Sequence, residues 1–159
     1  MAQKKKLTII MFSGDLDKVM AAFTLATTAA STGMDVTMFF TFWGLNVVRK
    51  DGGPKPKGLV RRMLGIMNKG GVRNLKLSKF HMMGMGTGML KGLMKEAKMP
   101  TVEDMIKLAK QLGVKFIACT NTMGVYGLCE DNFIPEVDSC AGAATYLAEA
   151  SEAQINLFI

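Results

Sequence analysis

The chain has 159 residues, of which 49% are hydrophobic and 21% are charged, and it carries a formal net charge of +7. These values are typical of one globular domain that can bury a sizeable core. No apolar run reaches the roughly 20 residues that a membrane-spanning helix needs, and residues 7–12 are too short for the apolar part of a secretory signal. We therefore expect an intracellular, cytoplasmic protein.

The first quarter of the chain predicts a βαβ unit. Residues 7–12 are an apolar run of strand length. Residues 16–32 place apolar side chains along one helical stripe and are followed by Gly33, a common helix stop signal. Residues 35–42 are rich in β-branched and aromatic residues, as strands are. A strand, a helix and a strand in this order imply parallel pairing through a right-handed crossover.

A basic segment follows this unit. Residues 49–79 contain ten Lys and Arg residues against one acid, Asp51. Such a segment attracts anionic small molecules, an acidic protein or a membrane surface, or it is simply a solvated loop. Nucleic acid is the weakest alternative, because no aromatic residue precedes Phe80 in the segment to stack on bases. We expect residues 59–68 to form a short amphipathic helix here.

Methionine and glycine dominate the next stretch, residues 81–99, which holds six methionines and four glycines. We expect a helix from about Thr87 onward and methionines that pack in the core or at a subunit interface. His81 is interpreted as a loop residue. Residues 49–86 together are interpreted as an insertion within a single domain that spans residues 1–159.

The remaining third predicts alternating helices and strands. A helix begins with the capping pair Thr101 and Asp104, and residues 114–119 then read as a buried strand. A short helix from Thr120, an extended piece, a last helix and a strand over residues 154–159 complete the chain. The whole pattern predicts a doubly wound parallel α/β sheet with helices on both faces.

Cys119 is the candidate reactive residue. It ends a predicted strand, where such sheets place their sites, and it precedes a predicted helix, whose free N–H groups stabilise a thiolate. Thr120, Asn121 and Thr122 offer further hydroxyl and amide donors. The alternative is a buried cysteine that only fills the core, as free cysteines often do.

The other two cysteines are weaker candidates. Cys129 is followed directly by two acidic residues, and Cys140, expected at the start of the last helix, lies two residues after Asp138. Nearby negative charge raises the pKa of a thiol. Cys129 is kept as a candidate second thiol. Spacings of 10 and 11 residues and a single histidine fit no common zinc pattern, and the odd number of cysteines argues against a disulfide framework.

Several segments together resemble a known family. They are "FSGDLDKVMAAF", "VTMFFTFWGLNVVRK", "MMGMGTGMLK", "FIACTNTMGVYGL" and "VDSCAGAATYLAEA", in this order along nearly the whole chain. They resemble the DsrE/DsrF/DrsH-like family of small sulfur-relay proteins, and the middle pieces are most similar to its larger, methionine-rich branch.

The resemblance implies a flavodoxin-like sheet, homo-oligomers such as trimers or hexamers, and a cysteine that carries sulfane sulfur as a persulfide. That cysteine matches Cys119. It also implies a sulfurtransferase or carrier that needs no cofactor, a small TusA-like protein as sulfur partner, anionic sulfur compounds as substrates, and contact with a membrane surface. The competing hypothesis is a non-catalytic oligomeric α/β module that binds an acidic partner or a membrane surface.

Overall fold

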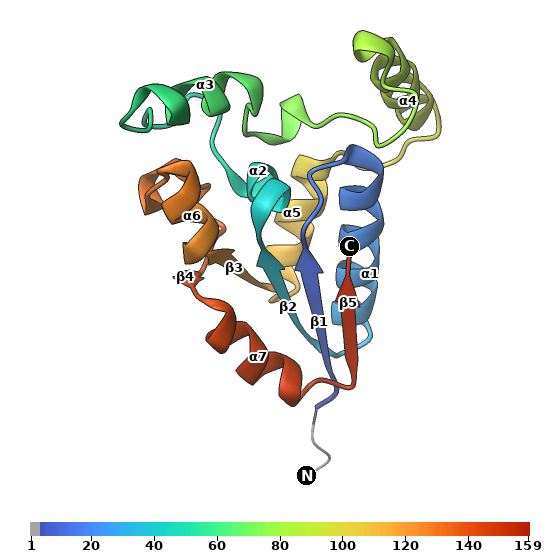
Figure 1. The fold of residues 1–159 in the computed structure, drawn as a ribbon. Helices are drawn as coiled ribbons and strands as arrows, with labels where there is room; N and C mark the ends of the chain where they lie inside the picture. The colour runs from blue at the N-terminus through green and yellow to red at the C-terminus, as the bar shows by residue number, and fades with distance from the viewer. Residues whose placement is uncertain (1–3) are drawn as a thin grey trace.

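Five parallel strands form the central sheet of the computed structural model, which describes residues 4–159 (Figure 1). Their order across the sheet is β4-β3-β2-β1-β5. The strands are β1 (Lys6–Met11), β2 (Asp35–Phe40), β3 (Lys115–Cys119), β4 (Ser139–Ala141) and β5 (Ile155–Phe158). The predicted parallel α/β architecture is confirmed, and the four strands predicted from apolar runs begin and end within two residues of their predicted limits.

β1 is an interior strand because both of its neighbours pair with it. Leu7 lies opposite Val36 of β2 and opposite Ile155 of β5. The last strand of the chain therefore flanks β1 on the side away from β2, where the flavodoxin order places the third strand. Because all pairings are parallel, the carboxyl ends of the strands meet at one edge of the sheet.

One face of the sheet packs against α1 (Leu16–Ser31) and α5 (Val102–Gln111), and this side holds the larger core. Phe116 of β3 is fully buried there. Its ring lies edge-on to Phe23 of α1 at 5.8 Å and to Phe40 of β2 at 5.3 Å between centroids. Alternate residues of each strand point to this face, as the two-residue period of a strand requires.

The opposite face is covered by α7 (Ala143–Ser151), which lies at the lower left in Figure 1. A smaller cluster forms here around Phe39, Ile117 and Tyr146. The rings of Phe39 and Tyr146 are 5.1 Å apart, and the Tyr146 hydroxyl hydrogen-bonds Thr8 Oγ1 at 3.1 Å. This cluster positions the side chains at the carboxyl ends of β2 and β3.

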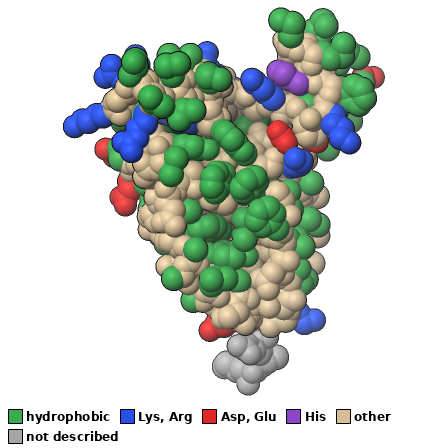
Figure 2. All heavy atoms as spheres, viewed as in Figure 1, with side chains coloured by type: hydrophobic (Ala, Val, Ile, Leu, Met, Phe, Trp, Pro, Cys, Tyr) green, Lys and Arg blue, Asp and Glu red, His purple; other side chains and the backbone are tan. Residues whose placement is uncertain are grey.

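An aromatic strip, defined as Phe12, Phe42 and Phe158, runs beside this cluster. The Phe12 ring is 5.2 Å from that of Phe42 and 5.5 Å from that of Phe158. Phe158 is 68% exposed and Phe42 is 47% exposed. Hydrophobic side chains gather along the middle of the same face in Figure 2. This side of the sheet therefore presents aromatic surface to its surroundings.

Short helices between β2 and α5 project beyond the carboxyl edge of the sheet (Figure 1). They are η1 (Phe42–Gly44), α2 (Leu45–Val48), α3 (Leu59–Met67), η2 (Val72–Asn74), η3 (Met82–Gly84) and α4 (Met85–Glu96). α2 is buried throughout, whereas α3 buries no residue and α4 buries only Thr87. The predicted helix in the basic segment is confirmed, and the helix expected from Thr87 begins two residues earlier.

Candidate functional site

Cys119 is the last residue of β3 and the N-cap residue of α6 (Thr120–Tyr126). Its side chain belongs to the smaller cluster with Phe39, Ile117 and Tyr146, and it is only 5% exposed. β3 holds it there because a parallel strand that ends in a helix turn places its last side chain at the carboxyl edge of the sheet. The thiol is thus nearly enclosed.

Polar groups nevertheless lie close to the sulfur, although the Cys119 side chain forms no capping hydrogen bond at the start of α6. Burial raises the pKa of the Cys119 thiol, but the backbone N–H of Thr122, the hydroxyls of Thr41 and Thr122, and the backbone N–H of Asn121 lower it by more. The net pKa is therefore below that of an ordinary cysteine. Donors to the charged form favour a thiolate, which is the nucleophilic form of cysteine.

The two threonine hydroxyls form a small network of their own. Thr41 Oγ1 and Thr122 Oγ1 are 3.0 Å apart, and the backbone N–H of Phe42 donates to Thr122 Oγ1 over 3.3 Å. Thr122 is 3% exposed. The backbone of η1 thereby fixes the orientation of a hydroxyl that faces Cys119.

The three predicted donors after Cys119 differ in their effect on the pKa of its thiol. The N–H and hydroxyl of Thr122 and the N–H of Asn121 lower the pKa of Cys119, whereas Thr120 is exposed and is not among the groups that shift this pKa. Thr41 was missed from the sequence. The available signal was its place at the end of the strand next to β3, because neighbouring parallel strands end at the same edge.

Cys129 lies beyond the other end of α6. It is exposed, and its thiol donates to Asn132 Oδ1 over 3.3 Å. Seven helical residues separate it from Cys119, which is a rise of about 10 Å along the axis. A disulfide needs Cα atoms within about 7 Å, so a direct bond between these two thiols requires α6 to unwind. The role of Cys129 as a second thiol stays a prediction.

Cys140 is in β4, not at the start of the last helix as predicted. Ser139 pairs with Ile117, and α7 begins only at Ala143 after its N-cap residue Gly142. Ala118 and Cys140 are paired and both pack toward the larger core, so Cys140 and Cys119 point to opposite faces of the sheet.

The pKa of Cys140 is raised, as predicted, but the cause differs. Burial raises it first and Glu130 second. The expected effect of Asp138 is absent because that carboxylate accepts hydrogen bonds from Lys110 and from the backbone N–H of Phe116. Electrostatics therefore ranks Cys119 above Cys140.

The methionine-rich stretch is not core in this chain. Met82, Met83, Met85 and Met89 are 61% to 101% exposed. The prediction of core packing is wrong for these four, and a subunit interface stays a prediction. His81 Nδ1 lies 2.8 Å from Thr87 Oγ1, so this loop histidine hydrogen-bonds the first turn of α4.

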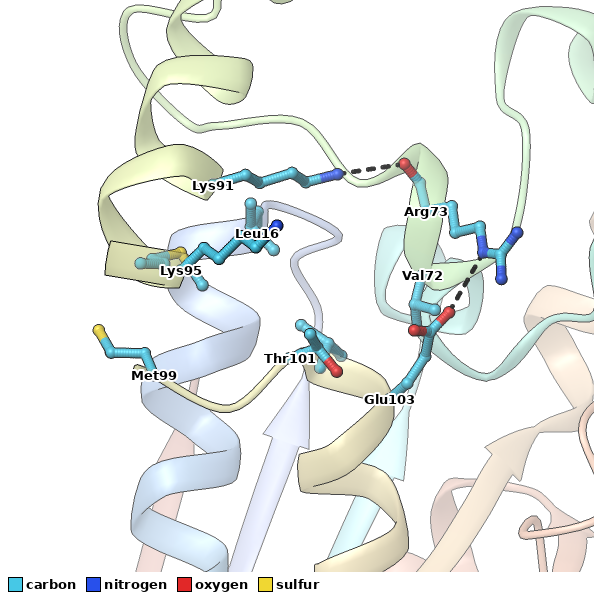
Figure 3. Close-up of a pocket in the computed structure, with 10 residues that line it drawn as sticks. Leu16, Val72, Arg73, Lys91, Lys95, Met99, Thr101 and Glu103 are labelled. Carbon is cyan, nitrogen blue, oxygen red and sulfur yellow. Dashed lines mark hydrogen bonds and ion pairs between the residues drawn. The ribbon is translucent and has the colours of Figure 1, made fainter. Parts of the chain in front are cut away.

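An apolar pocket lies apart from the thiol, between α4, η2 and the N-terminus of α5 (Figure 3). Its volume is about 390 Å³. At its rim Arg73 Nε is 3.4 Å from Glu103 Oε1, and Lys91 Nζ donates to the Arg73 carbonyl. None of the three cysteines lines it. The site of Cys119 is instead a buried thiol with converging donors.

Comparison with known proteins bears on this thiol site. The sequence model of the DsrE/DsrF/DrsH-like family matches residues 3–158. The chain belongs to this family. It is 44% identical over 158 residues to the uncharacterized protein YrkE of Bacillus subtilis, covering 99% of this chain and 98% of YrkE. It is 34% identical over 170 residues to the sulfur carrier protein DsrE2 of Allochromatium vinosum, covering 99% of each chain. The predicted family resemblance is confirmed.

A solved structure supports the fold. MTH1491 of Methanobacterium thermoautotrophicum, a protein of unknown function, superposes with a TM-score of 0.55 over 98% of this chain and 100% of its own. At 14% identity this similarity concerns the fold alone. Within residues 4–159, no helix has the length and apolar character needed to cross a bilayer, and no three His, Cys, Asp or Glu side chains gather as metal ligands would.

Proposed function

We propose that this protein is a sulfur carrier that binds sulfane sulfur on Cys119 as a persulfide and passes it to the thiol of an acceptor protein. The observation that carries the proposal is the place of a nearly enclosed thiol at the carboxyl end of β3 and the start of α6. Thr41 and Thr122, near this thiol, lower its pKa. The sulfur carrier DsrE2, similar over its whole length, supports a role in sulfur relay.

The chemistry needs only thiols. The Cys119 thiolate attacks the outer sulfur of a donor persulfide R–S–SH, a new S–S bond forms, and the R–S⁻ thiolate leaves with the electron pair. The product is Cys119–S–SH. An acceptor thiolate then attacks the outer sulfur, takes it as its own persulfide and releases the Cys119 thiolate. Electrons balance at both steps, so no cofactor or external oxidant takes part. The donors of Thr41, Asn121 and Thr122 also stabilise the anionic persulfide.

The acceptor or donor is proposed to be a small TusA-like protein in a reducing, cytoplasmic compartment. The persulfide sulfur has to reach the partner's thiol, and the aromatic strip lies beside Thr41 at the same edge. Exposed aromatic surface of this kind favours protein contacts. The strip also supports the proposed homo-oligomer, a trimer or hexamer, because apolar side chains of this size are usually covered.

A second candidate function is binding to an anionic membrane surface or an acidic partner without catalysis. α3 exposes Leu59, Val60, Ile66 and Met67 at 70% to 78%, and cationic side chains stand beside the exposed apolar ones at the α3 and α4 end of the molecule (Figure 2). A helix that is apolar on one side and basic on the other is typical of the membrane interface.

Mass spectrometry separates the two candidates. Protein incubated with polysulfide is expected to gain sulfur on the Cys119 peptide, reversibly on addition of a reducing thiol. Cys119→Ser is expected to abolish this gain without loss of fold, and Cys140→Ser, a matched control on the other face of the sheet, to leave it unchanged. Loading that survives Cys119→Ser and disappears with Cys140→Ser would reject the proposed site. The absence of any adduct on folded protein would favour the binding function.

A further inference from the structure

A hollow beneath α3 collects positive charge. It lies between α3 and the turn after α2, and its volume is about 460 Å³. One lining residue, Asp51, is acidic. The basic side chains that line this cationic hollow are Arg49, Lys50, Lys55, Arg62 and Lys69. None of the ion pairs found within residues 4–159 includes any of these five.

Among the five basic residues of the cationic hollow, Arg49 is held in place by hydrogen bonds to neutral groups. Its Nη1 donates to Asn46 Oδ1 over 3.0 Å and to the carbonyl of Asn68 over 3.2 Å. Asn46 is itself buried, so its amide holds the Arg49 guanidinium in a defined position. No protein acceptor within residues 4–159 engages Nε or Nη2 of Arg49. Neutral groups therefore bind the guanidinium at Nη1, and its Nε and Nη2 donors are available to a ligand.

The backbone at Gly70 and Gly71 passes close to the side chains of Arg49 and Asp51. A Cβ at Gly70 would lie 2.6 Å from Cβ and Nε of Arg49. A Cβ at Gly71, where φ is +99°, would lie 2.0 Å from Asp51 Oδ1. Both positions therefore require glycine. The Asp51 carboxylate in turn accepts from Asn74 Nδ2 over 3.1 Å and not from any of the five cations.

Burial lowers the pKa of Arg49, and Tyr126 acts in the opposite sense. A partly desolvated cation without a carboxylate partner destabilises the folded chain unless an anion joins it. Lys50 Nζ and Arg62 Nε donate to the carbonyls of Asp131 and Pro56, and Asp51 is the acidic residue on the lining. The hollow therefore carries net positive charge, which favours a negatively charged ligand.

We infer that the cationic hollow binds a tetrahedral oxyanion of the phosphate, sulfate or thiosulfate class. A guanidinium presents parallel N–H donors that match two oxygens of such an ion, and Arg62 and Lys69 add charge from α3 and the loop after it. The ligand is either a free ion or the phosphate of an anionic lipid, since Ile66 of α3 also lines the hollow and is 71% exposed. Cys119 does not line the hollow, so this inference stands independently of the proposed sulfur chemistry.

Titration calorimetry on the full chain tests the site, with inorganic phosphate and then thiosulfate at constant ionic strength. A parallel arm measures cosedimentation with phosphatidylglycerol vesicles and with phosphatidylcholine vesicles. Removal of one charge-assisted hydrogen bond is expected to weaken binding by about tenfold or more. Arg49→Gln removes the anchored donor, and the double variant Arg62→Gln, Lys69→Gln removes exposed charges with little risk to folding. Lys5→Gln, at the opposite end of the sheet, is the matched control.

Saturable binding of either free ion, weakened in both site variants and retained in Lys5→Gln, supports the site with a free oxyanion as ligand. Binding confined to phosphatidylglycerol vesicles, with the same dependence on the variants, supports it with a lipid headgroup as ligand. Absence of saturable binding in both arms overturns the inference, as does equal weakening by Lys5→Gln. Sulfur loading on Cys119, measured on the same samples, reports on the proposed function separately.

Discussion

Thr122→Val is the sharpest test of how the fold activates Cys119. Valine keeps the shape of the side chain but removes the hydroxyl that faces the sulfur and that also contacts Thr41 and the N–H of Phe42. The thiolate loses a donor, so its pKa rises relative to the native protein. The backbone N–H groups of Asn121 and Thr122 remain, so activation is reduced and not abolished.

The size of the effect follows from the strength of one charge-assisted hydrogen bond. Such a bond contributes about 1.5–3 kcal/mol, which is roughly a 10- to 150-fold change in the thiolate fraction on the acidic side of the titration. The thiolate of the variant is more basic and is therefore the better nucleophile. With a Brønsted slope of about 0.4–0.5, this gain in nucleophilicity offsets nearly half of the loss in alkylation rate on a logarithmic scale. We expect alkylation near pH 6 to slow by roughly 4- to 15-fold.

The assay is the rate of iodoacetamide alkylation from acidic to alkaline pH, in a background with Cys129→Ser and Cys140→Ser so that only Cys119 reacts. The midpoint of the profile is expected to move to higher pH in Thr122→Val. Thr120→Val, an exposed neighbour on the same helix, is the control and is expected to match the parent. An unchanged midpoint in folded Thr122→Val would refute the assignment of the hydroxyl as a thiolate donor.

Two further predictions concern the scaffold. Phe116→Ala removes a fully buried ring between Phe23 and Phe40 and is expected to lower the free energy of unfolding in urea by about 3–5 kcal/mol; a loss below about 1 kcal/mol would show that this core is not packed as described. Thr101→Ala removes the side-chain half of the α5 capping box and is expected to cost about 1 kcal/mol. The Thr101 hydroxyl and then its N–H lower the pKa of Asp104 below its ordinary 3.8. The part of the stabilisation that comes from the hydroxyl donating to the Asp104 carboxylate is therefore present above that pH and is lost on acidification below it, whereas the bond from the Asp104 N–H to Thr101 Oγ1 does not depend on this titration. The difference between the two proteins in urea titrations should shrink from neutral to acidic pH, and a constant difference would contradict the linkage.

The strands were predictable because their signal is local. Residues 7–12 and 114–119 are apolar runs bounded by polar residues, and such runs need little tertiary help to be recognised. β4 was harder to predict, because it has three residues and begins at Ser139, the second residue of an Asp-Ser pair that is also typical of a helix cap. Its pairing with β3 decides its conformation, and pairing between distant segments has no local signature.

Exposure was the least predictable property. The methionines after His81 have the composition of a core, yet Met83 of η3 is fully exposed, because η3 and α4 project from the body of the domain (Figure 1) and Thr87 is the buried residue of α4. The basic character of residues 49–79 was evident from the count of charges. Their convergence on one hollow depends on the tertiary arrangement that places both Lys50 and Lys69 on its lining.

The parallel α/β class, the position of Cys119 at a strand end and the family of the chain could be predicted from residue order, because strand patterns, glycine stop signals and ordered motifs are local features of the chain. The groups that shift the pKa of Cys119 depend on the fold. Thr41 is 78 residues before Cys119 and reaches it because β2 and β3 are parallel neighbours. Cys140 is paired one residue away from Cys119 on the next strand, yet the alternation of side chains across a sheet turns it to the opposite face.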